Sequence, residues 1–374
     1  MRTCLLILFL SCCLLLRSSA QTADKHATAA TKNLFNHLQQ TRHAGFLFGH
    51  QDDLAYGAGW QYEKDKSDIR GVTGEYPAVY GWELGHLELD STKNLDGVPF
   101  EFIRQSIRKG FERGGVITIS WHFTNPLTGN PAWDAKPGAV ASILPGASKH
   151  ALYLAWLDKL AAFLGSLKDA HGNLIPVIFR PFHELNGNWF WWGKQHCSPG
   201  ELIALYRFTE SYLRDTKQLH HLLYAYNTDR FATREEYLDR YPGDDWVDVV
   251  GFDIYQRAEG NINFSKELDR MLGTLESIAE EKKKLPALTE FGYNGIPDSS
   301  WWTQTFLPAI GQHRIVYALA WRNAGKKTDG SEEYYAPFPG QVSAKDFTLF
   351  AANQRVWLQR RAARAGLYTK GKHR

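Results

Sequence analysis

The chain has very little cysteine. Four of its 374 residues are Cys, and three of these lie within the first twenty positions. If that segment is removed, Cys197 remains alone, and a disulfide within the mature chain is excluded. Cys197 lies in a predicted loop with no His-containing partner motif near it in the sequence, which argues against a thiol nucleophile.

The sequence also lacks an excess of either charge and lacks the motifs of several enzyme classes. Lys and Arg total 43 against 40 acids, and removal of Arg2 and Arg17 would leave 41 against 40, a net charge of +1. This balance excludes the basic surface typical of nucleic-acid binding. No H-E-x-x-H, G-x-S-x-G or early glycine-rich strand-to-helix turn occurs, which argues against zinc proteases, esterases and dinucleotide-binding folds. The 14 His give no clustered ligand set, so we predict no metal and no cofactor.

Residues 1–20 differ in composition from everything that follows. A short positive start precedes a mostly apolar run over 5–16, and the small residues 18–20 resemble a cleavage site. We predict a secretory signal peptide at 1–20 and a mature chain at 21–374. The run is short for a membrane span of ~20 residues, and the pair at 11–12 is a poor lipoprotein signal. We therefore expect export across an inner membrane to the periplasm or the medium, and we favour the periplasm, because no anchor, binding module or sorting signal is visible.

Eight short apolar runs, each ending in polar residues, alternate with segments of helical periodicity. The runs are 46–50, 78–83, 116–122, 175–184, 222–227, 249–255, 286–292 and 316–323. The helical segments are 24–44, 99–113, 149–169, 200–217, 265–284 and 346–364. This alternation predicts an α/β fold of one domain, a (β/α)8 TIM barrel. A doubly wound open sheet is disfavoured because its glycine-rich turn is missing.

Polar side chains follow the apolar runs at the ends that a barrel brings to one mouth, its usual active-site face. They are His50, Glu83, His122, Glu184, Asn227, Tyr255, Glu290 and Arg322. The longest predicted loop, 123–147, follows the third run, and loops of this length are usually functional.

Two of these residues, Glu184 and Glu290, suggest the cleavage of a glycosidic bond. Such cleavage needs an acid for the leaving oxygen and a carboxylate on the other side of the sugar. If the carboxyl groups lie about 5–5.5 Å apart, the reaction proceeds with retention. The alternative is that each Glu pairs with an Arg, such as Arg180 or Arg322. Two such residues at strand ends in a chain with 13 Trp favour catalysis.

Six segments closely resemble glycoside hydrolase family 26, chiefly β-mannanases, within a clan of (β/α)8 retaining glycosidases. They are LFGHQDDLAYG at 47–57, YPAVYGWELG at 76–85, SWHFTNPLTGN at 120–130, FRPFHELNGNWFWWG at 179–193, TEFGYNG at 289–295 and AWRNA at 320–324. The resemblance covers essentially the whole mature chain.

The resemblance implies roles for individual residues. Glu184 would be the acid/base and Glu290 the nucleophile, with His183 beside the nucleophile and Tyr255 hydrogen-bonded to it. The residues expected around the cleavage point are His122, Trp133, Trp189, Trp321 and Arg322, with His50 and Gln51 at the strand-one end of the cleft. Trp191 and Trp192 are expected to be divided between sugar platform and loop packing.

The resemblance also implies the activity: hydrolysis of internal β-1,4-mannosidic bonds in mannan, galactomannan and glucomannan. The polymer or a manno-oligosaccharide would be the partner, and a monomer is the default because an open cleft must admit a chain. Three alternatives stay open. They are an exo-acting enzyme that releases mannobiose, an enzyme for mixed-linkage β-glucan or β-1,3-xylan, and a sugar-binding barrel without activity.

Overall fold

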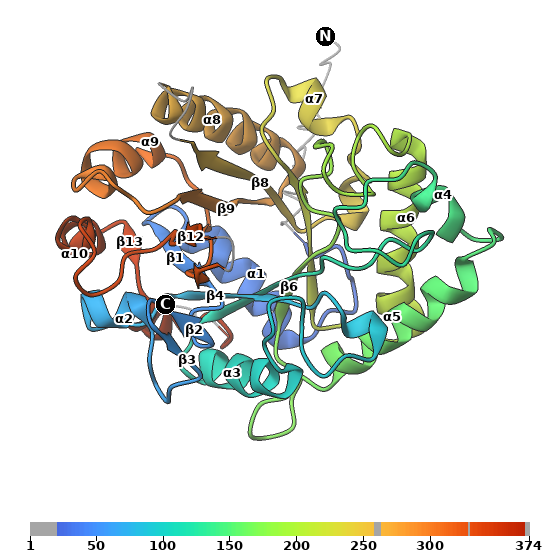
Figure 1. Ribbon diagram of the computed structural model, residues 1–374, viewed down its shortest axis with the longest axis horizontal. Helices are drawn as coiled ribbons and strands as arrows, with labels where there is room; N and C mark the ends of the chain where they lie inside the picture. The colour runs from blue at the N-terminus through green and yellow to red at the C-terminus, as the bar shows by residue number, and fades with distance from the viewer. Residues whose placement is uncertain (1–20, 258–262, 328–329, 371–374) are drawn as a thin grey trace, which may run out of the picture.

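The structure is a computed structural model that describes residues 21–257, 263–327 and 330–370 (Figure 1). The predicted leader at 1–20 lies outside the described residues. Successive strands of the main sheet are parallel neighbours, and the last pairs with the first, which closes the barrel. The eight barrel strands are β1 (Phe46–Gln51), β4 (Val79–Glu83), β5 (Val116–Ser120), β6 (Val177–Arg180), β7 (Leu222–Thr228), β8 (Val249–Gln256), β9 (Leu285–Tyr293) and β10 (Tyr317–Ala320). The predicted TIM barrel is confirmed.

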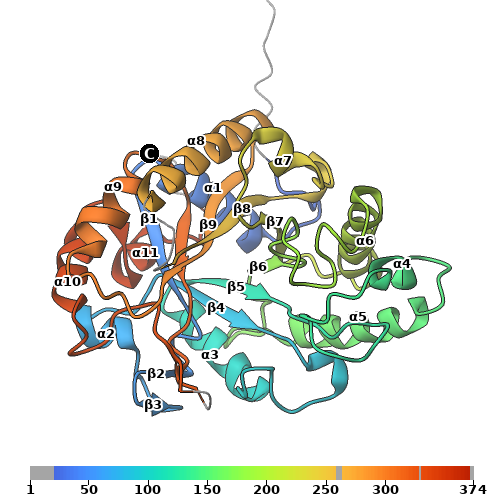
Figure 2. The same ribbon diagram turned by 45° about the horizontal axis from the view of Figure 1, so that its top comes forward.

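Helices surround the strands, as Figure 2 shows. The longer ones match the predicted segments: α1 (Ala29–Thr41), α3 (Phe100–Glu112), α5 (His150–Gly165), α6 (Pro199–Ser211) and α8 (Phe264–Lys282). Shorter ones are α2 (Asp68–Thr73), α4 (Ala139–Ile143), α7 (Arg234–Leu238) and α9 (Leu307–Ile310). The hairpins β2–β3 (Tyr56–Gly57, Trp60–Gln61) and β11–β12 (Gly325–Lys326, Glu332–Glu333) extend the loops after β1 and β10.

The prediction of a single closing helix at 346–364 is wrong. That segment is divided into α10 (Ala344–Ala352), the short strand β13 (Val356–Trp357) and α11 (Gln359–Ala365). The Asn353 side chain accepts the N–H of Arg355 at 2.9 Å, a local bond that competes with helix continuation. The Arg355 carbonyl then accepts the N–H of Phe46 at 2.8 Å, so β13 pairs with β1.

The lower half of the barrel is apolar, and α1 closes it. Leu34, Phe35 and Leu38 of α1 form one buried cluster with inward-facing strand residues such as Leu47 and Val249. These strand residues lie toward the N-terminal ends of the strands, so α1 covers the end opposite to the mouth. In Figure 1 it lies in the middle of the ring of strands. A second cluster fills the layer between the strands and the outer helices.

A β-bulge near the end of β9 changes the direction of two side chains. Phe252 of β8 lies opposite Leu288, but the next residue, Asp253, lies opposite Glu290. Thr289 is therefore the extra residue, and both Thr289 and Glu290 turn inward. The Thr289 hydroxyl donates to Asp253 at 2.8 Å. Bulges commonly re-aim side chains beside active sites, and this one brings Glu290 into the mouth.

In the described ranges, no helix combines the length and the apolar character needed to cross a membrane.

The interior close to β1 leaves no room for an added methyl group at Gly49. A Cβ there would lie 2.6 Å from Leu319 Cδ1 and 2.8 Å from Val79 Cβ. Gly49→Ala should lower the free energy of unfolding by about 1–3 kcal/mol in urea titrations, the usual cost of overpacking. The matched control is Gly200→Ala at the start of α6, where nothing lies within 4 Å. Equal stability of the two variants would contradict this account.

Candidate active site

A cavity of about 680 Å³ opens at the carboxyl ends of the barrel strands. Its lining combines acids, imidazoles and aromatic rings. The lining residues are His122, Trp133, His183, Glu184, Trp189, Phe190, Asp229, Tyr255, Gln256, Arg257, Glu290, Tyr293, Asn294, Trp321 and Tyr335. The cavity thus contains most of the site residues predicted from the sequence.

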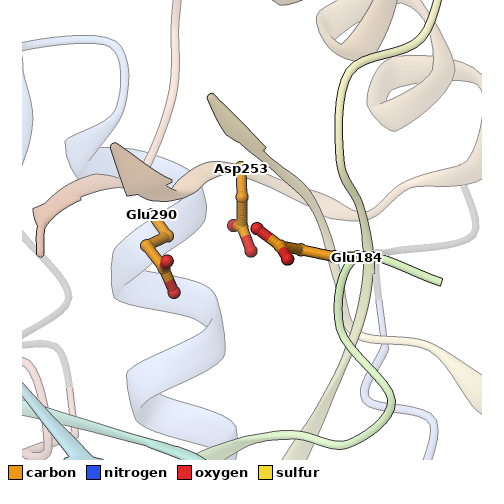
Figure 3. Close-up of side chains that lie close together, drawn as sticks. All are labelled: Glu184, Asp253 and Glu290. Carbon is orange, nitrogen blue, oxygen red and sulfur yellow. The ribbon is translucent and has the colours of Figure 1, made fainter. Parts of the chain in front are cut away.

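Three carboxylic acids converge at the base of this cavity (Figure 3). Asp253 comes from β8, Glu290 from β9 and Glu184 from the loop after β6. One carboxylate oxygen of each lies within 4.8 Å of the others. Such a cluster has the spacing of a cation site, but Arg180 already supplies a positive charge, so the arrangement does not call for a metal.

Arg180, at the end of β6, links two of these acids from below. Its Nη1 donates to Asp253 Oδ2 and its Nη2 to Glu290 Oε2, both at 2.8 Å. Burial alone would lower the pKa of this guanidinium, but the two carboxylates raise it above its usual value. The Tyr255 hydroxyl donates to the other oxygen of Glu290. Glu290 is therefore held by two donors in a fixed orientation.

Glu184 lies in a turn, four residues beyond the end of β6 rather than at the strand end that was expected. Its φ of 52° is in the left-handed region, as is the φ of 51° at Phe182. The indole N–H of Trp189 donates to its Oε2. Burial raises the pKa of Glu184 well above the usual value, and the charges of Asp253, Glu290 and Asp229 add to the effect. The protonated form that a general acid requires is thus favoured.

Glu83, His122 and His183 form a buried hydrogen-bonded chain beside the acids. Burial opposes ionisation of Glu83, but the charge and hydrogen bonds of His122, with the hydroxyl of Ser120, lower its pKa to about 2. The ionised Glu83 must accept from His122 Nδ1, at 2.7 Å. His122 Nε2 then lies 2.9 Å from His183 Nε2. Burial and the nearby charges of His122 and Arg180 lower the pKa of His183 well below its usual value, so this ring is neutral.

His183 was expected to help hold the charge state of the nucleophile. The structure places it in the same cavity as Glu290, but its ring hydrogen-bonds to His122. Arg180 and Tyr255 are the residues that donate to Glu290. His183 thus contacts His122, another residue of the cavity wall, rather than Glu290.

Aromatic rings form the open sides of the cavity. Trp133 is 50% exposed, and its ring stacks on His122 at 5.2 Å between centroids. Trp189 is 37% exposed. Trp191 and Trp192 are completely buried against Phe123, so both belong to loop packing and neither is a platform.

His50 and Gln51 do not line the cavity, contrary to the sequence prediction. Both are buried, at 0% and 2% exposure. His50 Nδ1 is 2.8 Å from Asp53 Oδ1 in the same turn. The turn after β1 continues at Asp52 with a φ of 54°, and the Tyr56 hydroxyl donates to that residue. Along β1 the side chain of His50 shares the outer face with Phe48, whereas Leu47 faces inward, so His50 turns away from the mouth.

Arg322 also lies outside the main cavity. It lines a neighbouring hollow of about 700 Å³ together with Trp60 and Tyr334. It forms ion pairs with Asp96 and Glu333, so two acids hold its guanidinium in place. Its guanidinium carbon also lies 5.5 Å from the centroid of the Trp321 ring, which does line the main cavity.

Several cavity residues were missed by sequence analysis: Asp229, Gln256, Arg257, Tyr293, Asn294 and Tyr335. Asp229 is the most informative. Burial raises its pKa to about 6, although the backbone N–H and charge of Arg230 oppose the shift. Asp229 lies two residues beyond Asn227, and its place just after the fifth apolar run was the signal that could have identified it.

Asp229→Asn should move the basic limb of the kcat/KM profile to lower pH. Removal of a negative charge near Glu184 stabilises its ionised form, so its pKa falls and the protonated acid is lost earlier as pH rises. The measurement is hydrolysis across pH 4–9, with Asp169→Asn, in the loop before β6 at the opposite barrel end, as the control. An unchanged basic limb in Asp229→Asn would show that the two groups are not coupled.

Glu83 should contribute a pH-dependent part of the stability. Its pKa is about 2 in the folded protein against an ordinary 4.5, so its stabilisation is complete above pH 4.5 and is lost as pH falls toward 2. The difference in unfolding free energy between wild type and Glu83→Gln, measured by urea titration, should therefore shrink between pH 4.5 and 2. The exposed Glu112→Gln should show no such change. A difference that is constant with pH would contradict the assignment.

A barrel mouth with two facing carboxylic acids among partly exposed indoles defines the class of the glycoside hydrolases. Residues 23–327 match the sequence model of Glycosyl hydrolase family 26. The chain belongs to this family, which confirms the resemblance found in its motifs.

Individual relatives agree with this assignment. The chain is 33% identical over 356 residues to a mannan endo-1,4-β-mannosidase of Bifidobacterium adolescentis, with 89% of this chain and 35% of that protein covered. A Bacillus subtilis mannan endo-1,4-β-mannosidase is 30% identical, with 80% and 81% covered. The structure of a GH26 β-mannanase from Bacteroides ovatus superposes with a TM-score of 0.87 at 44% identity, with 93% and 99% covered. The chain thus spans about a third of the Bifidobacterium protein and most of the other two.

Proposed function

We propose that this protein is a β-1,4-mannanase that hydrolyses internal bonds of mannan, galactomannan and glucomannan with retention of configuration. The observation that carries the proposal is the pair formed by Glu184 and Glu290, whose nearest carboxylate oxygens lie within 4.8 Å at the barrel mouth. That spacing fits a double displacement and leaves little room for the water that inversion needs between the groups. The names of the relatives support mannan as the substrate.

In the first step Glu290 attacks the anomeric carbon while Glu184 transfers its proton to the leaving glycosidic oxygen. Arg180 and Tyr255 orient the attacking carboxylate. In the second step the ionised Glu184 takes a proton from water. That water displaces Glu290 from the glycosyl intermediate, and the starting protonation states are restored. Hydrolysis by this route uses no cofactor.

The aromatic rings would bind the sugar chain. Trp133, Trp189 and Trp321 lie around the acids and offer apolar faces on which pyranose rings can stack. The imidazole rings of His122 and His183 would contact hydroxyl groups of the sugars bound between these tryptophan rings. Arg322 would contribute at the neighbouring hollow, where Asp96 and Glu333 fix its position.

The proposal extends to the setting of the enzyme. Residues 1–20 would be removed during export, and 21–374 would act as one catalytic domain in the periplasm or outside the cell. The sequence of the leader supports export. A monomer is proposed because the cleft must admit a polymer.

The acid and nucleophile roles separate when the leaving group is varied. Glu184→Gln should lose activity on mannan but keep kcat/KM for an aryl mannobioside with an activated leaving group, because such a group departs without protonation. Glu290→Ala should lose activity on both substrates. Full activity of Glu184→Gln on mannan would refute the assignment.

The pattern of products tests the type of cleavage and the substrate. We expect a mixture of manno-oligosaccharides early in the digestion of linear β-1,4-mannan. The measurement is chromatography of the products over time. Mannobiose alone from the start would indicate exo action, and products from mixed-linkage β-glucan alone would indicate another polymer. Oligosaccharide binding without products would indicate a binding protein.

A further inference from the structure

The side chain of Asn186, two residues beyond Glu184, connects the turn that carries Glu184 to the loop after β7. Its Oδ1 accepts the N–H of Asp229 and its Nδ2 donates to the carbonyl of Arg230, both at 2.7 Å. We propose that Asn186 is a positioning residue that fixes the general acid relative to the nucleophile. The inference rests on the proposed function, because it assigns those roles to Glu184 and Glu290.

The turn needs support from outside because its own backbone is strained. Phe182 and Glu184 both have a positive φ, near 50°, a conformation that is unfavourable for residues other than glycine. Inside the turn, the Gly187 N–H donates to the Glu184 carbonyl at 2.8 Å. Strain of this kind persists only where the surrounding contacts hold it.

The turn is attached on two sides. Toward β5, the Trp192 indole donates to the His183 carbonyl at 2.8 Å, and the Trp191 indole donates to the Phe123 carbonyl at 3.1 Å. Toward β7, the two bonds of Asn186 make the connection. Loss of the two Asn186 bonds would leave the turn held only by the bonds of Trp191 and Trp192 among these contacts. The turn could then relax away from the cavity.

The connection continues to the nucleophile. The guanidinium of Arg230 donates to the carbonyl of Tyr255, and the Tyr255 hydroxyl donates to Glu290. Arg230 Nε also lies 3.4 Å from Glu267 of α8. A continuous hydrogen-bonded path therefore runs from the acid turn, through Asn186 and Arg230, to the residue that orients the nucleophile.

A displaced acid affects only the reactions that need its proton. Proton transfer from a positioned acid is worth about 10²- to 10⁴-fold in rate, and it depends on hydrogen-bond geometry. A shift of about 1 Å can cost on the order of 10²-fold. Bond cleavage with a good leaving group does not use the proton and should be insensitive to the same shift.

The test compares Asn186→Ala with wild type on two aryl β-mannobiosides, one with a dinitrophenyl and one with an unsubstituted phenyl leaving group. We expect kcat/KM to fall about 10- to 100-fold for the phenyl substrate and to stay within about threefold for the dinitrophenyl substrate. The same split should be seen with Asn186→Ser, a smaller change that serves if the Ala variant does not fold. The matched control is Asn188→Ala, since Asn188 lies in the same motif with an exposed side chain and should behave as wild type.

A double-mutant cycle separates positioning from general damage. In a Glu184→Gln background there is no acid to position, so adding Asn186→Ala should not lower kcat/KM for the phenyl substrate further. Equal losses on both substrates, an additive loss in the double variant, or wild-type kinetics would each overturn the proposal. Failure of the proposed function is distinguishable, because Glu184→Gln alone would then show no dependence on the leaving group.

Discussion

The buried guanidinium of Arg180 is the charge on which the barrel mouth depends. It lies 2% exposed between Asp253 and Glu290 and also donates to the amide oxygen of Asn227 at 3.0 Å. Burial raises the pKa of Asp253 well above its usual value although the charge of Arg180 opposes the shift, and the neighbouring Glu290 adds to the rise. The interior of the barrel near the N-terminal ends of the strands is apolar. Arg180, the last residue of β6, therefore lies between this packed core and the charged site.

The position of Arg180 also gives the two glutamates of the cavity different surroundings. Glu290 accepts hydrogen bonds from the guanidinium and from the Tyr255 hydroxyl. Glu184 approaches from the other side, where it meets acids and an indole, and its pKa is raised by burial and by those acids. This difference in surroundings suits the acid and nucleophile roles proposed above. The bulge at Thr289 is essential to it, because a regular strand would turn Glu290 to the outer face.

The barrel and the presence of Glu184 and Glu290 in its cavity could be predicted from the sequence, whereas several residues of the cavity wall could not. Strand ends in a TIM barrel converge whatever the loops do, so Glu290, Tyr255 and His122 were placed correctly in the cavity by their positions after apolar runs. His50 and Gln51 followed the same pattern, but both are buried outside the cavity lining, and His50 shares the outer face of β1 with Phe48. Asp229 lies just after the fifth apolar run, a signal that sequence analysis did not use. Tyr335 comes from the loop after β12, whose path depends on tertiary contacts that no periodic pattern encodes. The single helix expected at 346–364 does not form, because pairing of Val356 with β1 outweighs the helical periodicity of that segment.

The closure of the barrel by α1 has a consequence for how the enzyme can be attached to something else. The segment before α1 is tied to the N-terminal ends of the strands: the Ala23 N–H donates to Asp248 at 2.6 Å, and Asp24 pairs with His220 at 2.7 Å. The polypeptide therefore enters the fold on the side opposite to the cavity. A linker, resin or carrier joined ahead of residue 23 would lie behind the barrel and leave the cavity facing outward.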